Sequence, residues 1–294
     1  MKKVEQYCGP MRFAHRGMVQ NAPENTIGAF EAAIDAGCEG IEIDIVRSRD
    51  GQVIVAHDGN FTRMTCGHPN GGSNRFLKDM TADEICAVEL PFANHLLDPE
   101  LPEGSEDEGL AILPFRVLGQ EVPYETALQK DPRMTHLMTF AEFDAWFATR
   151  SENVTIEIEV KAPGIAKPLF DIIRAGKNAG RYIVFSGVPA YNEELQALIR
   201  TEGKPEGLRM GANLRYMNDA TRKAVEEWDL FEIGLNAEHF TQEDVLWLRE
   251  RGVAVLSNLG DYPAWWEKLC SMDVLGFKTN YVEAFTNWWL ENRR

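Results

Sequence analysis

Residues 40–46 of this 294-residue chain read Gly-Ile-Glu-Ile-Asp-Ile-Val. Successive side chains of a strand point to opposite faces, so the three isoleucines share one face and Glu42 and Asp44 share the other. In a parallel barrel one face of each strand meets helices and the other meets the barrel interior. We therefore predict that two carboxylates point together into a dry interior, where they must be protonated, paired or metal-bound.

The same alternation returns in residues 155–161, which read Thr-Ile-Glu-Ile-Glu-Val-Lys. It places Glu157, Glu159 and Lys161 on one face. Carboxylates from two strands that meet in one interior form a set of hard oxygen ligands, which suits Mg²⁺ or Ca²⁺ better than zinc. The alternative is a pair of strands with solvated polar faces, but the flanking strand–helix pattern favours buried strands.

Apolar β-rich runs alternate with helix-period segments along most of the chain. This pattern predicts an α/β fold, a (β/α)8 TIM barrel in one domain over residues 1–294. A doubly wound open sheet is the alternative, and it would bind ligands at a switch point instead. The expected barrel strands are residues 12–15, 40–46, 154–161, 182–186, 208–212, 230–235, 253–257 and 274–279, with an extra strand at 53–57. Helices are expected at residues 24–36, 241–251, 264–270 and 282–290.

Residues 66–133 interrupt this alternation of strands and helices, because they are rich in Gly, Pro, Asn and acidic residues. We read them as an insertion on the barrel, with a loop at 68–74 and a mobile surface segment at 99–109. Residues 81–84 read Thr-Ala-Asp-Glu, a capping box that should start a short helix.

The formal net charge of −16 argues against nucleic acid or an anionic membrane surface as the main partner. The five cysteines are scattered and lack CxxC spacing, which favours free thiols in a reducing compartment. No apolar run approaches the ~18 residues that span a bilayer, and no signal peptide is visible. We expect a cytoplasmic protein with no stable membrane association.

Two histidines close predicted strands: His15 ends residues 12–15 and His57 ends residues 53–57. The carboxyl ends of TIM-barrel strands form the active-site face, and imidazoles there can act as general acid and general base. The alternative for each histidine alone is a structural hydrogen bond.

Two basic residues adjoin these groups. Arg16 follows His15, and Lys161 ends the second carboxylate strand. Each can hold a phosphate oxygen. For Lys161 a salt bridge to Glu157 or Glu159 is the alternative, and both interpretations are compatible.

Five short motifs stand in a set order, and together they resemble the N-terminal signature of glycerophosphodiester phosphodiesterases. They are residues 13–17 (Phe-Ala-His-Arg-Gly), 23–26 (Pro-Glu-Asn-Thr), 40–44 (Gly-Ile-Glu-Ile-Asp), 50–51 (Asp-Gly) and 57–58 (His-Asp). Residues 159–161 resemble the family's Glu-x-Lys strand, and Ser186 and residues 279–280 resemble its later strand ends.

This resemblance implies a TIM barrel with a small insertion after the second strand, here residues 47–138. It implies metal-dependent hydrolysis of a small phosphodiester, a glycerophosphodiester giving an alcohol and glycerol 3-phosphate, with one divalent cation, Mg²⁺ or Ca²⁺. The implied roles are metal ligation by Glu42, Asp44 and Glu159, acid–base catalysis by His15 and His57, and phosphate contact by Arg16 and Lys161.

The chain also departs from the family pattern. Leu256-Ser257 stands where a Trp-Thr pair is usual, Glu157 where a neutral residue is common, and Asn280 where an Asp is usual. These departures leave the leaving alcohol open, and a sugar-phosphodiester hydrolase is one alternative. A lysophospholipase D-like enzyme on the same barrel and a non-catalytic phosphodiester-binding protein are others. The acid–base assignment of the two histidines, the nucleophile (water or a neighbouring substrate hydroxyl) and a homo-oligomeric state also stay open.

Overall fold

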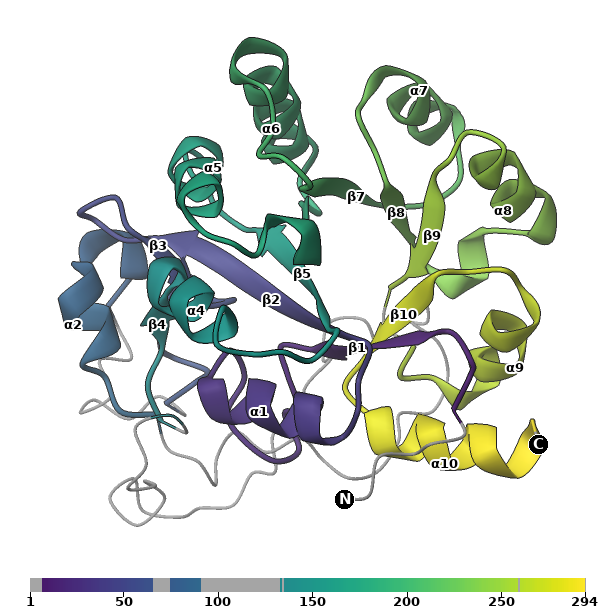
Figure 1. The fold of residues 1–294 in the computed structure, drawn as a ribbon, viewed down its shortest axis with the longest axis horizontal. Coiled ribbons are helices and arrows are strands. Elements are labelled where there is room, and N and C mark those ends of the chain that lie inside the picture. The colour runs from purple at the N-terminus through teal and green to yellow at the C-terminus, as the bar shows by residue number, and fades with distance from the viewer. Residues whose placement is uncertain (1–6, 66–74, 91–132, 134, 259, 294) are drawn as a thin grey trace.

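The structure is a computed structural model that describes residues 7–65, 75–90, 133, 135–258 and 260–293. Eight parallel strands close into a barrel, because β1 pairs with both β2 and β10 (Figure 1). The predicted TIM barrel is therefore confirmed, and the open sheet is excluded. The barrel strands are β1 Met11–His15, β2 Gly40–Arg47, β5 Thr155–Val160, β6 Tyr182–Phe185, β7 Arg209–Arg215, β8 Glu232–Leu235, β9 Ala254–Ser257 and β10 Gly276–Thr279.

Helices surround the barrel (Figure 1). They are α1 Ile27–Asp35, α4 Phe140–Phe147, α5 Ala166–Ala175, α6 Pro189–Glu202, α7 Asp219–Glu227, α8 Gln242–Arg249, α9 Pro263–Ser271 and α10 Val282–Asn292, with 3₁₀ turns η7 Ala179–Arg181 and η8 Ala237–His239. α1 begins three residues later than residue 24, where it was predicted to start. Asn25 adopts a left-handed backbone conformation, with φ 56°, and Thr26 caps the helix by accepting a hydrogen bond from the Ala29 amide.

The extra strand predicted at residues 53–57 lies outside the barrel. It is β3 Val53–Val55, which runs antiparallel to the end of β2 and pairs on its other side with β4 Met138–Thr139, a strand that was not predicted. β3 ends at Val55, so His57 lies two residues beyond the strand that it was predicted to close. Because β3 runs antiparallel to β2, it brings the chain back beside the end of β2. There the Ala56 amide donates a hydrogen bond to the Asp44 carbonyl at 2.9 Å.

The predicted short helix is present as α2 Ala82–Cys86, after the 3₁₀ turn η2 Leu77–Asp79. Its capping box is complete between Thr81 and Glu84, as predicted. The loop at 68–74 and the segment at 99–109 lie outside the described residues. Within those residues, no helix combines the length and apolar character needed to cross a bilayer, and the four described cysteines are free.

Side chains of β2 and β5 alternate between the outer and the inner face of the barrel, and this alternation determines what packs on each face. The isoleucines of both strands point outward and pack against aromatic residues of the helices in the largest core cluster. The carboxylates point inward. At the base of β2, Gly40 is required, because a Cβ there would stand 2.3 Å from the Phe13 ring.

Candidate active site at the carboxyl end of the barrel

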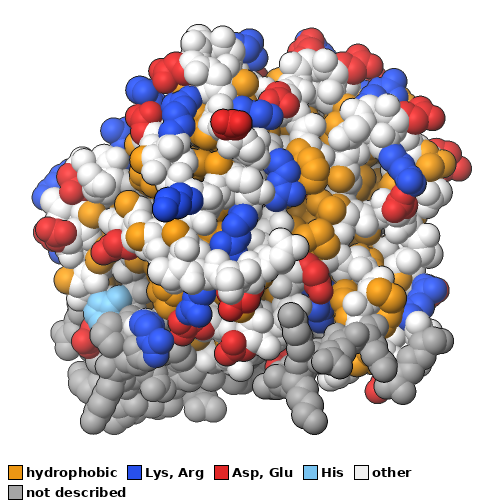
Figure 2. Space-filling model, in the orientation of Figure 1, with side chains coloured by type: hydrophobic (Ala, Val, Ile, Leu, Met, Phe, Trp, Pro, Cys, Tyr) orange, Lys and Arg blue, Asp and Glu red, His pale blue; other side chains and the backbone are white. Residues whose placement is uncertain are grey.

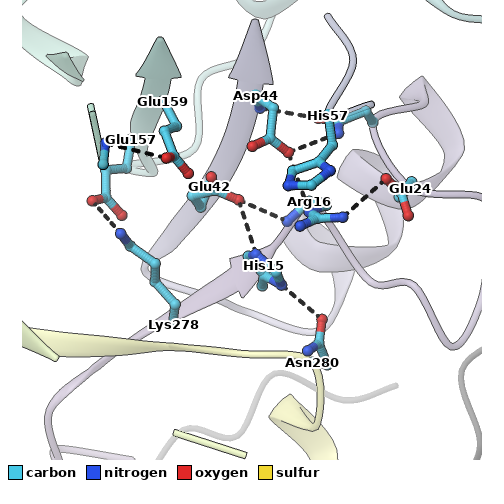
Figure 3. Close-up of polar contacts among 12 residues, drawn as sticks. His15, Arg16, Glu24, Glu42, Asp44, His57, Glu157, Glu159, Lys278 and Asn280 are labelled. Carbon is cyan, nitrogen blue, oxygen red and sulfur yellow. Dashed lines mark hydrogen bonds and ion pairs between the residues drawn. The ribbon is translucent and has the colours of Figure 1, made fainter. Parts of the chain in front are cut away.

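Three acidic side chains of β2 and β5 converge inside the barrel. Glu42, Asp44 and Glu159 each offer a carboxylate oxygen, and these oxygens lie within 4.8 Å of one another (Figure 3). The parallel register pairs Asp44 with Glu159, so both carboxylates stand at the same height of the barrel. The sequence prediction that these three residues meet in one buried place is thus supported by the geometry.

The surroundings of this acidic group shift the pKa values of Glu42 and Asp44 in opposite directions. Burial raises the pKa of Glu42 well above its usual value, and Asp44 and Glu159 raise it further. Burial also acts to raise the pKa of Asp44, but His57, Arg16 and Lys161 together lower it. Glu42 Oε1 and Asp44 Oδ1 are buried and have no hydrogen-bond partner among the described residues. An all-oxygen donor set with buried oxygens that lack donors fits a hard divalent cation.

His15 is held by a chain of hydrogen bonds from residues that follow the neighbouring strands β10 and β9. Its Nδ1 lies 3.0 Å from Asn280 Oδ1, and the Asn280 amide nitrogen donates to Asp261 Oδ2 at 2.6 Å. Because the Asn280 amide oxygen faces the ring, Nδ1 carries the proton and Nε2 presents its lone pair toward Glu42, 3.8 Å away. Burial lowers the pKa of His15 well below its usual value, and Arg16 lowers it further.

His57 has an anionic partner instead. Its Nδ1 lies 2.6 Å from Asp58 Oδ1, while Arg63 Nε donates to Asp58 Oδ2 at 2.8 Å. In Figure 3 the His57 ring lies beside the Asp44 carboxylate. The partner of His57 Nδ1 is thus a carboxylate, whereas the partner of His15 Nδ1 is a neutral amide.

The two basic residues predicted near the site take different positions. Arg16 is buried, with a side chain only 5% exposed, and its guanidinium pairs with Glu24 at 3.1 Å and Asp44 at 3.2 Å. Lys161 is partly exposed and pairs with Glu159 at 3.1 Å and Asp44 at 3.6 Å. The salt bridge considered for Lys161 therefore forms with Glu159.

Glu157 lies deeper in the barrel and is not part of this acidic group. Its Oε1 pairs with Lys278 Nζ of β10 at 2.9 Å. Burial raises the pKa of Glu157 to about 7 although Lys278 opposes that shift. Burial also raises the pKa of Glu232, a second buried carboxyl beside it, and neighbouring Glu157 raises it further.

Sequence reasoning gave no role to Glu24, Asn25 or Arg63, although residues 23–26 were noted as a motif. Glu24 accepts hydrogen bonds from both Arg16 and Arg63, and the Asn25 amide donates to Asp44 Oδ2 at 3.1 Å. Burial acts to raise the pKa of Glu24, but Arg16 and Arg63 outweigh it and lower that pKa strongly. The sequence signal that could have found these residues is an Asn just before a helix, because Asn tolerates the left-handed conformation that Asn25 adopts there.

Arg63 links Glu24 to Asp58, so it braces both the Arg16 side and the His57 side of the site. We expect Arg63→Lys to destabilise the fold by about 1–2 kcal/mol, because an ammonium cannot reproduce the forked contacts. Urea unfolding measures this loss. Arg75→Lys is the matched control, because Arg75 pairs with Glu84 on the exposed surface, and its change should stay within about 0.5 kcal/mol. Equal losses in the two variants would contradict the bracing role.

Fold and site together define a TIM-barrel protein with a group of three converging carboxylates beside two histidines at the carboxyl end of the barrel. The chain belongs to the glycerophosphoryl diester phosphodiesterase family, whose sequence model matches residues 15–284. This confirms the family resemblance read from the five motifs.

Two curated relatives show how far the sequence similarity reaches. A glycerophosphodiester phosphodiesterase of Caldanaerobacter subterraneus subsp. tengcongensis is 44% identical over 72 residues, which cover 24% of this chain and 27% of that protein. Human glycerophosphodiester phosphodiesterase 1 is 38% identical over 90 residues, which cover 31% of this chain and 25% of that protein. The matches thus span about a quarter of each relative's length.

Solved structures match over nearly the whole chain. A glycerophosphodiester phosphodiesterase of Thermotoga maritima has a TM-score of 0.61 at 19% identity and covers 96% of this chain and 100% of that one. An Oleispira antarctica phosphodiesterase, solved with the product sn-glycerol-3-phosphate, has a TM-score of 0.66 at 16% identity, covering 95% and 96%. At these identities the likeness shows the shared fold.

Proposed function

We propose that the protein is a metal-dependent phosphodiesterase that hydrolyses a glycerophosphodiester to an alcohol and glycerol 3-phosphate. The convergence of Glu42, Asp44 and Glu159 in a buried group beside two histidines carries this proposal. The family membership and the names of the relatives support it. Mg²⁺ or Ca²⁺ is the cation that the oxygen ligands favour.

A divalent cation held by Glu42, Asp44 and Glu159 would supply Lewis-acid stabilisation of charge on the phosphate. Lys161 adds a positive charge at the rim, where a non-bridging oxygen can reach it. Arg16 was predicted to contact the phosphate, but its guanidinium already pairs with Glu24 and Asp44. In this proposal Arg16 orients the Asp44 carboxylate, and Lys161 contacts the substrate.

The hydrogen-bond partners of the histidines favour a division of labour. His15 faces a neutral amide oxygen through Nδ1–H, so its Nε2 accepts the proton of the attacking group, either water or a neighbouring substrate hydroxyl. In this proposal His57, whose Nδ1 is hydrogen-bonded to Asp58, donates a proton to the leaving alkoxide.

Metal dependence tests the proposal directly. After EDTA treatment, we expect no turnover of glycerophosphocholine, glycerophosphoglycerol or bis(p-nitrophenyl) phosphate, and recovery when Mg²⁺ or Ca²⁺ is restored. Because the cation contributes several kcal/mol, Glu159→Gln should lower kcat/KM by at least about 100-fold. Glu250→Gln is the control, because that side chain is 77% exposed at the C-terminal cap of α8. Turnover that persists in EDTA, or no turnover with any metal, would refute the function.

A further inference from the structure

Three asparagines stand at the carboxyl ends of consecutive strands, beside the acidic group. Asn213 lies near the end of β7, and Asn236 and Asn258 directly follow β8 and β9. Their backbone amides continue the parallel ladder, donating to the carbonyls of Ser186, Arg215 and Leu235. Side chains of a strand alternate, and the outward residues Leu235 and Val255 lie in a core cluster, so Asn236 and Asn258 face inward. We call these three residues the amide row.

The amide row is linked by its own side chains. The Asn258 amide nitrogen donates to Asn213 Oδ1 at 2.9 Å and to Asn236 Oδ1 at 2.6 Å. Both of its donors are therefore used, which fixes its orientation. The Asn258 Oδ1 is left buried, in a residue only 5% exposed, with no partner among the described residues. A buried acceptor without a donor is costly, so this oxygen is placed to receive a hydrogen bond from outside the chain.

Gly234 keeps the space in front of this oxygen free of protein. A Cβ at Gly234 would stand 3.0 Å from Asn258 Oδ1 and 3.2 Å from the Asn213 Cα, so even alanine would crowd both. The register of β7 shifts between Asn213 and Arg215, and such a bulge redirects the side chain beside it.

The amide row adjoins the acidic group through Gly187. The Gly187 amide donates to Glu159 Oε1 at 3.3 Å, and a Cβ at Gly187 would stand 2.9 Å from that oxygen and 3.9 Å from Asn213 Nδ2. Gly187 and Asn213 also line a cavity of about 530 Å³ between α6 and α7, which lie on neighbouring positions around the barrel (Figure 1). Of the amide row only Asn213 lines this cavity, but the contacts of Gly187 with Glu159 and Asn213, and of Asn213 with Asn258, place the row next to the acidic group.

We propose that the amide row is a hydroxyl-binding subsite that selects phosphodiesters whose leaving alcohol is a polyol. This inference rests on the proposed function and names its substrate class. The unpartnered acceptor, Asn258 Oδ1, requires a donor, which a polyol hydroxyl supplies. A quaternary ammonium such as choline has no hydrogen to donate, so it leaves that oxygen unpaired.

The test compares glycerophosphoglycerol with glycerophosphocholine, which share one glycerol phosphate and differ in the other alcohol. The wild-type kcat/KM should favour glycerophosphoglycerol by at least about tenfold, the value of one well-made buried hydrogen bond. Asn258→Ala should bring the ratio close to one. Because both rates come from the same sample, loss of folded enzyme or of metal cancels in the ratio.

Gly234→Ala is a second variant that leaves all three asparagines in place, and it should lower the ratio by filling the space before Asn258 Oδ1. Ser257→Ala is the matched control. Ser257 neighbours Asn258, but its buried hydroxyl has no partner among the described residues and it alternates to the outer face of β9, so the ratio should stay at the wild-type value.

A wild-type ratio near one, or a ratio unchanged in both Asn258→Ala and Gly234→Ala, overturns the subsite. Absence of turnover of both diesters and of bis(p-nitrophenyl) phosphate contradicts the proposed function instead. In that case calorimetric Kd values of the two diesters, measured in EDTA, give the same comparison without catalysis, and equal Kd values overturn the subsite.

Discussion

His57→Ala is expected to lower kcat by about 10²–10⁴-fold while the affinity for Mg²⁺ or Ca²⁺ is retained. The imidazole lies beside Asp44 but is not among the three residues whose oxygens converge, so its loss removes proton transfer rather than the cation ligands. His15→Ala should lower kcat to a similar extent, because Asn280 holds the ring with Nε2 directed toward Glu42. Steady-state kinetics and calorimetric metal titration of the same samples separate the two effects.

The matched control for both variants is His136→Ala. That ring bonds to the neighbouring Thr135 at 2.8 Å, and it has no place in the proposed mechanism, so kcat should not change. A milder variant, Asp58→Asn, keeps the His57 ring but replaces the carboxylate that holds its Nδ1 with a neutral amide, and it should show an intermediate rate. Wild-type turnover in either His→Ala variant would exclude that histidine from proton transfer.

Lys278→Met should cost the fold about 3–5 kcal/mol at pH 8, because it removes the cation that pairs with Glu157 in the closed interior. Burial already raises the folded-state pKa of Glu157 to about 7, and loss of Lys278 raises it further. In the unfolded chain this carboxyl ionises near its ordinary value of about 4.3. The folded state therefore binds the proton more tightly, and the stability of the variant falls as pH rises above that ordinary value.

Urea unfolding of Lys278→Met in EDTA at pH 5.5 and pH 8 measures this effect, and the loss should be smaller at pH 5.5. The double variant Lys278→Met/Glu157→Gln should recover part of the stability at pH 8, because the buried charge is gone along with its partner. A loss that is the same at both pH values, or a double variant no more stable than the single one, would show that the ion pair is not the cause.

The distribution of charged side chains is compatible with the proposed phosphodiester substrate, because positive charge lies at the site itself. Figure 2 shows Lys and Arg side chains interspersed with Asp and Glu side chains on the face in view, despite the net charge of −16. In the site itself Arg16 and Lys161 accompany the carboxylates. The positive charge that an anionic phosphodiester needs is therefore supplied at the site, by these side chains and by the proposed cation.

Much of the fold followed from local pattern. The eight barrel strands were all predicted, and the boundaries differ by a few residues at strand ends. β3 was predicted as an extra strand, but its antiparallel pairing with β2 was not, because an apolar run looks the same whatever strand it pairs with. The helix α1 was predicted to begin at residue 24, whereas in the structure Glu24 and Asn25 lie before the helix and hold Arg16 and Asp44.

The sequence by itself determined which side chains of residues 40–46 and 155–161 share a face, because a strand alternates with a period of two whatever its partners are. That was enough to predict that Glu42 and Asp44 would meet Glu157 and Glu159 inside a parallel barrel, and the family resemblance then singled out Glu159. Only the tertiary structure decided which residues complete the site. Closure of the barrel brings Asn280 to His15 across 265 residues and Lys278 to Glu157, and such contacts depend on strand order and register, which no local periodicity encodes.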